Sequence, residues 1–336
     1  MFKIFGFTKK NKEIIRRCYL TALEREPDEV GLNHYLKMMR SIIKPNGIDE
    51  KKLIKILKES GEGKKVKLAK VYDHKPPYVF TGLYNIKYWI RPNSVLDNAI
   101  VKNGIFNGWL CTKLKGLINK DSVIFDVGAN AGLLSLPFAK KCVPLGKVYS
   151  FDPDEKVVSQ LKKNIKLNSF SNIIVEEMAL QDNPATEKVT LNINRAVQDN
   201  GLRNDGLSTI VANLTYKISE KIVNASTIDR YVKENKIKKI EFIKIDAEGA
   251  DLKVLKGGRE TIKKSRPIVF YEHSPVLERF GNFKNLQKAF MFMQKLGYKQ
   301  YLKVKNKKLD LIEIKKYSQG LPDGDIICFH KLNLPN

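Results

Sequence analysis

The chain has 336 residues, of which 43% are hydrophobic and 9% aromatic, so it can bury a core and is not intrinsically disordered. Its 61 Lys and Arg against 36 Asp and Glu give a net charge of +25, and the excess is spread along the chain. An even spread is typical of a solvated surface and disfavours a nucleic-acid-binding arm. Four cysteines (Cys18, Cys111, Cys142 and Cys328) show no paired metal-ligand spacing, which indicates a reduced protein without structural zinc.

The chain carries no run of about 18 apolar residues, and residues 1–10 lack the apolar core of a signal peptide. We therefore expect a cytoplasmic protein. The aromatic and basic residues in 1–10 are compatible with peripheral contact with a membrane. The oligomeric state does not follow from the sequence.

Residues 11–60 are predicted to form a small all-α unit. Apolar residues recur at helical spacing in three stretches, Pro27 separates the first two, and Asp49 is placed to cap the third. The charged, Gly-rich stretch that follows, from Gly61 onward, is predicted to be a linker. We expect a helical domain over residues 1–62, a linker over 63–77 and an α/β domain over 78–336.

The α/β domain is predicted from alternating strand and helix patterns. One or two antiparallel strands are expected over 78–91, helices over 96–118, and a helix over 133–142 that Pro137 bends. Further strands are expected over 186–194, 299–304, 308–314 and 325–330, with helices beginning near 226 and over 286–296. The long loop 196–209 is predicted to be functional or mobile, because loops of this length are uncommon in compact folds.

Residues 123–132 are the stretch around which we interpret the domain. A β-branched strand ends in Asp126 and passes into a turn that contains Gly128, Asn130 and Gly132. Glycine permits a positive φ and close backbone approach, and the next helix directs free N–H groups toward the turn. Ordinary strand-to-helix turns also produce this pattern, so the motif gains weight only from the strands that follow.

Four later strands are predicted to end in acidic or polar residues. The strand 146–154 ends at Asp152, which lies 24 positions after Gly128, near the spacing at which an acid reaches a ribose diol. We expect Asp154 to cap the next helix, which leaves Asp152 for a ligand. The other three strands, 172–180, 239–249 and 267–275, bring the following residues to the same edge: Glu177, Met178, Ala179, Asp246, Glu248, Glu272 and His273.

Taken together these segments resemble the FkbM-type S-adenosylmethionine-dependent methyltransferases. The matching stretches are 125–132, 146–154, 164–168, 179–182, 243–257 and 266–273, and the likeness covers about residues 95–275. The resemblance implies a Rossmann-like class I methyltransferase fold, an α/β fold whose mostly parallel sheet has helices on both faces. Residues 19–35 resemble a small helical domain of unknown function often found beside glycan-acting enzymes, which implies no chemistry.

The resemblance also implies S-adenosylmethionine as cofactor and S-adenosylhomocysteine as product. The implied cofactor-binding residues are those of the turn, an acid at the ribose, a short stretch at the adenine and an acid near the reacting centre: Asp126, Gly128, Ala129, Asn130, Gly132, Asp152, Glu177, Met178, Ala179 and Asp246. The family methylates mainly hydroxyl oxygens of sugars and other small molecules. O-methylation of a small-molecule or glycan hydroxyl is therefore the expected chemistry, and nucleic acid is a disfavoured partner.

A hydroxyl acceptor needs a base, and three residues are candidates. His273 and Asp246 come first, with Glu248 behind them. An equally good interpretation makes His273 a surface histidine capped by residues 274–275. Asp246 could instead hold the cofactor ammonium or a divalent metal, but the sequence shows no second metal-ligand cluster, so no metal site is predicted.

Three other functions are alternatives to O-methylation. A nicotinamide-dependent oxidoreductase needs Gly-x-Gly-x-x-Gly after the first strand, which residues 128–132 do not supply. A nucleic-acid methyltransferase is disfavoured because no Asn/Asp-Pro-Pro-Tyr/Phe sequence follows the fourth strand. A catalytically silent binding module would keep the fold and transfer no methyl group.

Overall fold

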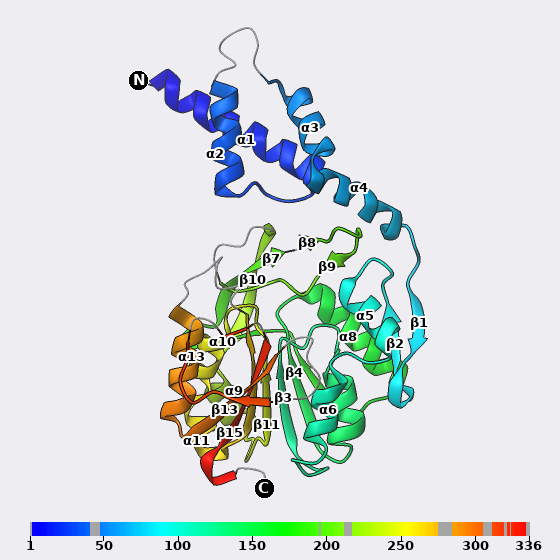
Figure 1. The fold of residues 1–336 in the computed structure, drawn as a ribbon, viewed down its shortest axis with the longest axis vertical. Helices are drawn as coiled ribbons and strands as arrows, with labels where there is room; N and C mark the ends of the chain where they lie inside the picture. The colour runs from blue at the N-terminus through cyan, green and yellow to red at the C-terminus, as the bar shows by residue number, and fades with distance from the viewer. Residues whose placement is uncertain are drawn as a thin grey trace.

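The N-terminal part of the chain is helical. The computed structural model describes residues 2–40, 48–194, 196–211, 217–274, 284–304, 311–318, 321–322 and 324–333. The first four helices are α1 (Phe2–Leu23), α2 (Glu29–Arg40), α3 (Glu50–Glu59) and α4 (Gly61–Asp73). Buried residues of α1, α2 and α3, including Ile15, Leu36 and Leu53, share one apolar cluster. These helices stand at one end of the molecule, above the α/β part (Figure 1).

The stretch from Gly61, predicted as a linker, is helical over Gly61–Asp73. Ser60 ends α3 and also begins α4, because its hydroxyl accepts a hydrogen bond from Gly63 N at 3.1 Å. A Cβ on Gly63 would collide with the backbone of Leu57 and Lys58. Glycine at position 63 therefore allows the close packing of two helices.

An eight-stranded sheet forms the centre of the α/β part, in the order β14-β13-β15-β12-β11-β3-β4-β5. Its strands are β3 (Val123–Val127), β4 (Lys147–Phe151), β5 (Ile173–Glu176), β11 (Phe242–Ile245), β12 (Ile268–His273), β13 (Tyr298–Val304), β14 (Leu311–Glu313) and β15 (Gly324–His330). The five strands from β12 to β5 are parallel, and β15, β13 and β14 add antiparallel pairs at one edge. The expected mostly parallel α/β fold is confirmed.

Helices cover both faces of this sheet, because successive strand residues point to opposite sides. Ile124 packs with α5 (Val95–Asn103), α6 (Gly108–Leu114) and α8 (Glu155–Asn168), whereas Phe125 packs on the other face. The helices of that second face are α9 (Ile228–Glu234), α10 (Asp251–Gly257), α11 (Arg259–Ser265) and α13 (Lys284–Lys295). After β3 the chain forms α7 (Ser135–Pro137) and then a short π-helix, η3 (Phe138–Cys142), so the helical geometry changes directly after Pro137, where a bend was predicted.

Smaller strands lie outside the main sheet. The hairpin of β1 (Tyr78–Thr81) and β2 (Lys87–Ile90), joined through η2 (Leu83–Asn85), confirms the predicted antiparallel pair. A second sheet joins β6 (Ala179–Leu180), β10 (Lys217–Ser226) and β7 (Lys188–Asn194), and β8 (Ala196–Val197) pairs with β9 (Arg203–Asn204). The sequence analysis missed β10, and the predicted strand 172–180 is split between β5 and β6. Part of the predicted strand 308–314 lies outside the described residues, and η4 (Lys331–Asn333) follows β15.

The chain order creates a crevice beside β3. From β3 the chain runs outward through β4 to β5, and it then returns to β11 on the other side of β3. In open α/β sheets, ligands bind at the carboxyl ends of the strands where the order reverses in this way. Within the described part of the chain, no helix is long and apolar enough to cross a lipid bilayer.

Candidate active site

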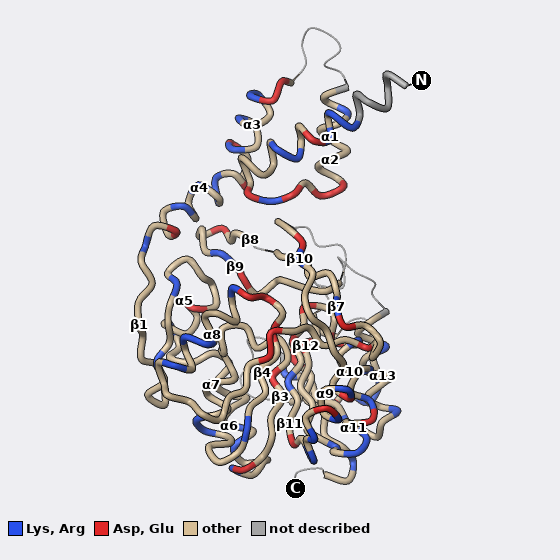
Figure 2. The backbone as a smooth tube through the Cα atoms, turned by 180° about the vertical axis from the view of Figure 1, so that it is seen from behind, with Lys and Arg blue, Asp and Glu red and all other residues tan. Residues whose placement is uncertain are grey.

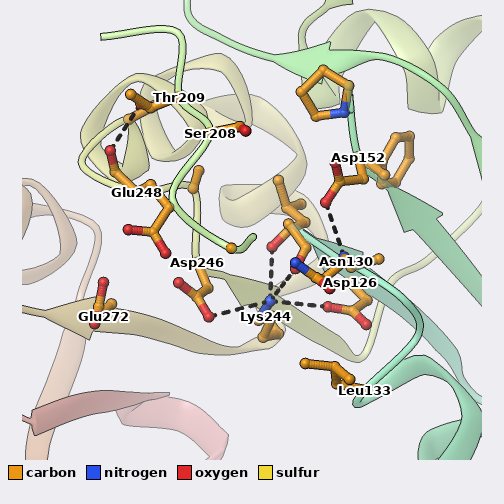
Figure 3. A pocket seen from close by; sticks show the side chains of 18 of the residues that line it. Asp126, Asn130, Leu133, Asp152, Ser208, Thr209, Lys244, Asp246, Glu248 and Glu272 are labelled. Atoms are coloured by element: carbon orange, nitrogen blue, oxygen red, sulfur yellow. Dashed lines mark hydrogen bonds and ion pairs between the residues drawn. The ribbon is translucent and has the colours of Figure 1, made fainter. Parts of the chain in front are cut away.

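A cavity of about 510 Å³ opens at this point, a size that suits a small organic ligand. It lies at the carboxyl ends of β3, β4, β11 and β12 and is partly covered by the loop after β9. Its lining includes Leu96, Phe106, Asp126, Gly128, Ala129, Asn130, Phe151, Asp152, Pro153, Met178, Ala179, Asn204, Gly206, Ser208, Thr209, Lys244, Asp246, Glu248, Phe270, Glu272, Ser274 and Asp325. Figure 3 shows how the polar members converge.

The turn after β3 is held by positive φ angles and close packing. Gly128 (φ 74°) and Asn130 (φ 49°) both adopt the left-handed region. A Cβ on Gly128 would overlap the carbonyl oxygen of Asp246, so only glycine lets the turn pack on β11. Gly132 differs, because it does not line the cavity, and a Cβ there would press on Leu136 and Leu161. Its role in this structure is helix packing.

Asp152 lies at the end of β4, 8% exposed, and lines the cavity as expected. It is not left free, however: its two carboxylate oxygens accept hydrogen bonds from Asn130 N and Asp154 N, each at 2.9 Å. Burial raises the pKa of Asp152 to about 6, against the lowering effect of these hydrogen bonds. A carboxylate has about four acceptor sites, so it can fix the turn and still accept a ligand hydroxyl. Asp154 caps α8 as predicted.

Lys244 is a functional candidate that the sequence analysis missed. Its ammonium group, on a side chain that is only 4% exposed, lies 3.3 Å from Asp126 Oδ1 and 3.6 Å from Asp246 Oδ2. It also donates to the carbonyl oxygens of Gly128 at 2.7 Å and Val127 at 3.2 Å. Figure 3 shows it at the centre of this cluster. Lys244 therefore connects the turn after β3 to the end of β11.

The strand register explains this arrangement. Lys244 pairs with Asp126 across β3 and β11, so both side chains point to the same face. Burial opposes the charge on Lys244, but the carboxylates of Asp126 and Asp246 outweigh that effect and raise its pKa above the ordinary value. A lysine inside an apolar strand was the available signal, because a buried ammonium group must be paired.

Asp126 is fully buried and takes part in a second set of hydrogen bonds, in addition to its ion pair with Lys244. Its Oδ2 accepts a hydrogen bond from Ser135 Oγ at 2.5 Å, and Ser150 Oγ donates to Ser135 Oγ at 2.8 Å. These hydroxyls and Lys244 together compensate the buried charge of Asp126.

Glu248 lies half-buried on the turn after β11 in a left-handed conformation with φ 50°. Burial, followed by the nearby charges of Asp246, Glu272 and Asp251, raises the pKa of Glu248 well above its ordinary value. Thr209 Oγ1 donates to the carbonyl oxygen of Glu248 at 2.8 Å, which fixes the turn from the opposite side of the cavity. A non-glycine residue held in this region with a perturbed pKa is typical of functional sites.

The structure places Glu272, and not His273, on the cavity. Along β12, Phe270 and Glu272 point into it, while Tyr271 and His273 point to the other face. His273 is 1% exposed, with Nδ1 3.0 Å from Pro322 O and Nε2 3.4 Å from Tyr317 Oη. The alternative that made it a surface histidine is wrong, and the cavity lining does not bring it together with Asp246 and Glu248.

The residues expected at the adenine do not all lie on the cavity. Met178 and Ala179 line the cavity beside Phe151 and Pro153, which form an apolar surface for a flat ring. Glu177 points outward, with its carboxylate 3.7 Å from Lys162 Nζ, and does not line the cavity.

Residues 204–209, part of the loop that was expected to be functional or mobile, cover the turn after β3. Asp205, 4% exposed, accepts from Arg91 at 2.6 Å and lies 3.4 Å from Lys156 Nζ. Ser208 Oγ donates to Asp154 Oδ2 at 3.0 Å. The loop is therefore held by ion pairs to Arg91, which follows β2, and to Lys156 of α8, and by the hydrogen bond to Asp154.

The cavity is acidic within a basic protein. Its lining holds six carboxylates (Asp126, Asp152, Asp246, Glu248, Glu272 and Asp325), and Lys244 is the one Lys or Arg that lines it among the described residues. Figure 2 shows acidic residues close together where β4 and β12 end, with Lys and Arg spread over the outer elements. Across the described ranges, no group of three or more His, Cys, Asp or Glu side chains has metal-binding geometry.

The sequence of residues 126–299 matches the model of the Methyltransferase FkbM domain, and this match spans more than half of the chain. The chain belongs to the FkbM methyltransferase family. The matched residues thus include the carboxyl end of β3 and all of β4, β11 and β12, the strands whose ends form the cavity. The resemblance inferred from the motifs is confirmed.

Known relatives are similar to parts of the chain. Methyltransferase 1 of Beauveria bassiana is 25% identical over 146 residues, which cover 41% of this chain and 58% of the relative. Methyltransferase sdnD of Sordaria araneosa is 27% identical over 154 residues, covering 40% and 59%. The crystal structure of Methyltransferase FkbM from Methylobacillus flagellatus KT has 15% identity and a TM-score of 0.40, covering 64% of this chain and 45% of that one. The chain thus spans less than two thirds of each of these relatives.

Proposed function

We propose that this chain transfers a methyl group from S-adenosylmethionine to a hydroxyl oxygen of a small, uncharged acceptor such as a sugar. One observation carries the proposal: within the FkbM domain, the turn 128–131, Asp152 and the acids around Lys244 converge on one cavity at the reversal of the strand order. The roles of the individual residues, which rest on the resemblance and on this geometry, are part of the proposal.

The residues of the cavity fit this cofactor chemically. Asp152 offers carboxylate oxygens for a ribose diol, and Phe151, Pro153 and Met178 offer apolar surface for adenine. The cofactor carries positive charge on its sulfonium and ammonium groups, which the acidic lining suits. When bound, S-adenosylmethionine would supply an electrophilic methyl group.

The chain's own residues would orient the acceptor and receive its proton. Glu248 is the base that the geometry favours, because it lines the cavity and burial raises its pKa, which makes the carboxylate a stronger proton acceptor. Lys244 holds Asp126 and Asp246 in place beside it. The loop 204–209 covers the turn and helps to exclude water.

The charge of the cavity supports an uncharged acceptor. Six carboxylates against one ammonium group repel phosphate and carboxylate groups, so RNA and anionic lipids fit poorly. A polyhydroxylated molecule suits such a lining, because each carboxylate can accept a hydroxyl hydrogen bond. The likeness of residues 19–35 to a domain found beside glycan-acting enzymes agrees with this choice by association.

Two measurements test the proposal. Calorimetry with S-adenosylmethionine and S-adenosylhomocysteine should show binding of both, and a labelled-methyl screen should show transfer to neutral glycans or other hydroxyl compounds. Absence of binding would overturn the proposal. Binding without transfer to any acceptor would favour a silent binding module, and salt-sensitive transfer to RNA would favour a nucleic-acid methyltransferase.

A further inference from the structure

The N-terminal helical unit consists of α1, α2, α3 and α4. Its last helix, α4, lies against the β8–β9 hairpin (Figure 1). Gly201, in the tight turn between the two strands, has φ 79° and packs on Leu68 so closely that a Cβ would come within 2.7 Å of Leu68 Cγ. Lys65 Nζ lies 2.5 Å from Asp199 Oδ1 in the same turn, although this pair is exposed and contributes little. The outer half of the loop therefore rests on α4.

Arg203 makes the stronger connection. Its guanidinium donates to both carboxylate oxygens of Asp73, the last residue of α4, at 3.0 and 2.6 Å. It also donates to Glu24 Oε2, just after α1, at 2.8 Å. The side chain is 15% exposed, so water screens these pairs less than it screens surface pairs.

The electrostatics of this cluster agree with its geometry. Hydrogen bonds from Arg203 and Asn93 lower the pKa of Asp73, although burial alone would raise it. Asn93 Nδ2 donates to Asp73 Oδ1 at 2.7 Å, and Arg203 N donates to Asn93 O at 2.6 Å. Arg203 is thereby tied to α4 and to the chain before α5.

The residue after Arg203 lies on the cavity. Asn204, Gly206, Leu207, Ser208 and Thr209 all line it, and Gly206 lies close to Asn130 of the turn after β3. Because successive strand residues point to opposite sides, Arg203 faces the N-terminal unit while Asn204 faces the cavity. Arg203, which binds α4, and Asn204, which lines the cavity, are therefore consecutive residues.

We infer that the N-terminal helical unit positions the cavity lining, with Arg203 as the positioning residue that couples α4 to residues 204–209. The unit is then part of the architecture of the site and acts without touching the ligand. The consequence for cofactor affinity rests on the proposed function, whereas the ordering of residues 204–209 does not.

The test compares full-length variants by hydrogen exchange and by calorimetry. In the ligand-free chain, Arg203→Ala should increase amide exchange in residues 204–209 and leave the exchange of β3 and β11 unchanged. The same variant should bind S-adenosylhomocysteine about tenfold more weakly, because part of the binding free energy must then order the loop. Arg203→Lys should fall between Ala and the wild type, since lysine keeps the charge and loses the two-pronged geometry.

Matched variants separate positioning from general destabilisation. Arg230 also pairs with two carboxylates, Glu187 at 3.0 Å and Glu234 at 2.7 Å, but lies on α9 and not on the cavity, so Arg230→Ala should change neither readout. Asp73→Asn should cause a smaller increase in amide exchange at residues 204–209 and a smaller loss of affinity than Arg203→Ala. It replaces Arg203→Ala in the test if that variant does not fold.

The outcomes distinguish the inference from the proposed function. Wild-type exchange at residues 204–209 in both Arg203→Ala and Asp73→Asn would overturn the inference, whatever the chain binds. A wild-type chain that binds neither S-adenosylmethionine nor its product would overturn the proposed function, and the exchange data would still decide whether Arg203 orders the loop.

Discussion

Lys244 and Asp126 lie directly opposite each other on β11 and β3, with Nζ 3.3 Å from Oδ1 and both side chains almost fully buried. A buried ion pair is a weak source of stability, but breaking it leaves an uncompensated charge. The pair also fixes the turn after β3, because the same ammonium group donates to the carbonyl oxygens of Val127 and Gly128.

Lys244→Met should therefore lower the free energy of unfolding by about 3–5 kcal/mol, the cost of leaving a buried carboxylate unpaired. Urea unfolding measures this change. The double variant with Asp126→Asn should recover part of the loss, since neither charge then remains. A double variant less stable than Lys244→Met alone would contradict the pairing.

Gly128→Ala should lower the free energy of unfolding more than Gly249→Ala, a comparable substitution nearby. Gly128 and Gly249 both have positive φ, but a Cβ on Gly128 meets the Asp246 carbonyl, whereas a Cβ on Gly249 meets nothing within 4 Å. Gly249→Ala should thus cost only the backbone strain, about 1–2 kcal/mol, and Gly128→Ala more than about 3 kcal/mol. Equal losses in thermal or urea unfolding would show that the close approach is unimportant.

Asp152→Ala should weaken S-adenosylhomocysteine binding by about 100-fold or more, because it removes the proposed ribose acceptor and the hydrogen bond that holds Asn130 of the turn after β3. Calorimetry measures the affinity. Glu177→Ala is the matched control: its carboxylate points away from the cavity, so affinity should stay at the wild-type value. Wild-type affinity in Asp152→Ala would remove the ribose assignment.

Cofactor affinity should fall on acidification through the pKa of Asp152, which burial raises to about 6. Above this pH the carboxylate is ionised and accepts hydrogen bonds, and below it the protonated form accepts fewer. The affinity should then drop by up to about tenfold per pH unit. Calorimetry between about pH 8 and about pH 5 measures the slope, which should be smaller in Asp152→Asn.

Asp251 provides a control for that titration. Burial also raises the pKa of Asp251 to about 6, but Asp251 does not line the cavity, so Asp251→Asn should keep the wild-type slope. Unfolding is not expected to cause the loss of cofactor affinity at low pH. Since both pKa values are raised, the folded chain holds these protons more tightly than the unfolded chain, and this contribution to stability is present at low pH and lost as the pH rises through about 6.

Glu248→Gln should lower kcat by about 100-fold or more with little change in cofactor affinity, because it removes the proposed base and keeps the shape of the side chain. His273→Gln is the comparison, since both residues were candidates from the sequence. His273 lies on the opposite face of β12, so its substitution should affect stability more than kcat. A larger kcat loss in a folded His273→Gln would reassign the base.

Sequence patterns predicted the elements that depend on local chemistry. The strand before Gly128, the Asp154 cap of α8 and the change of helical geometry after Pro137 all follow from the preferences of a few adjacent residues. Most of the cavity lining around β3 and β4 was predicted for the same reason, because chain order determines where parallel strands end.

The other features of the site depend on strand register and on contacts between residues that are far apart in the chain. The spacing of residues in the sequence gives no information about either. Glu272 and His273 are neighbours in sequence, and only the pairing of β12 shows which one faces the cavity. Lys244 was overlooked because its partner Asp126 is far away in the chain. Arg203 meets Asp73 across 130 positions, so no local pattern could connect them.

The position of β15 between β12 and β13 affects how the protein can be made in the cell. During synthesis β12 and β13 leave the ribosome before the strand that must join them, so β12 keeps an unpaired edge until residue 330 has emerged. Exposed strand edges favour association with other chains. The main sheet is therefore completed only after β15 has emerged, and until then β12 and β13 can associate with other chains.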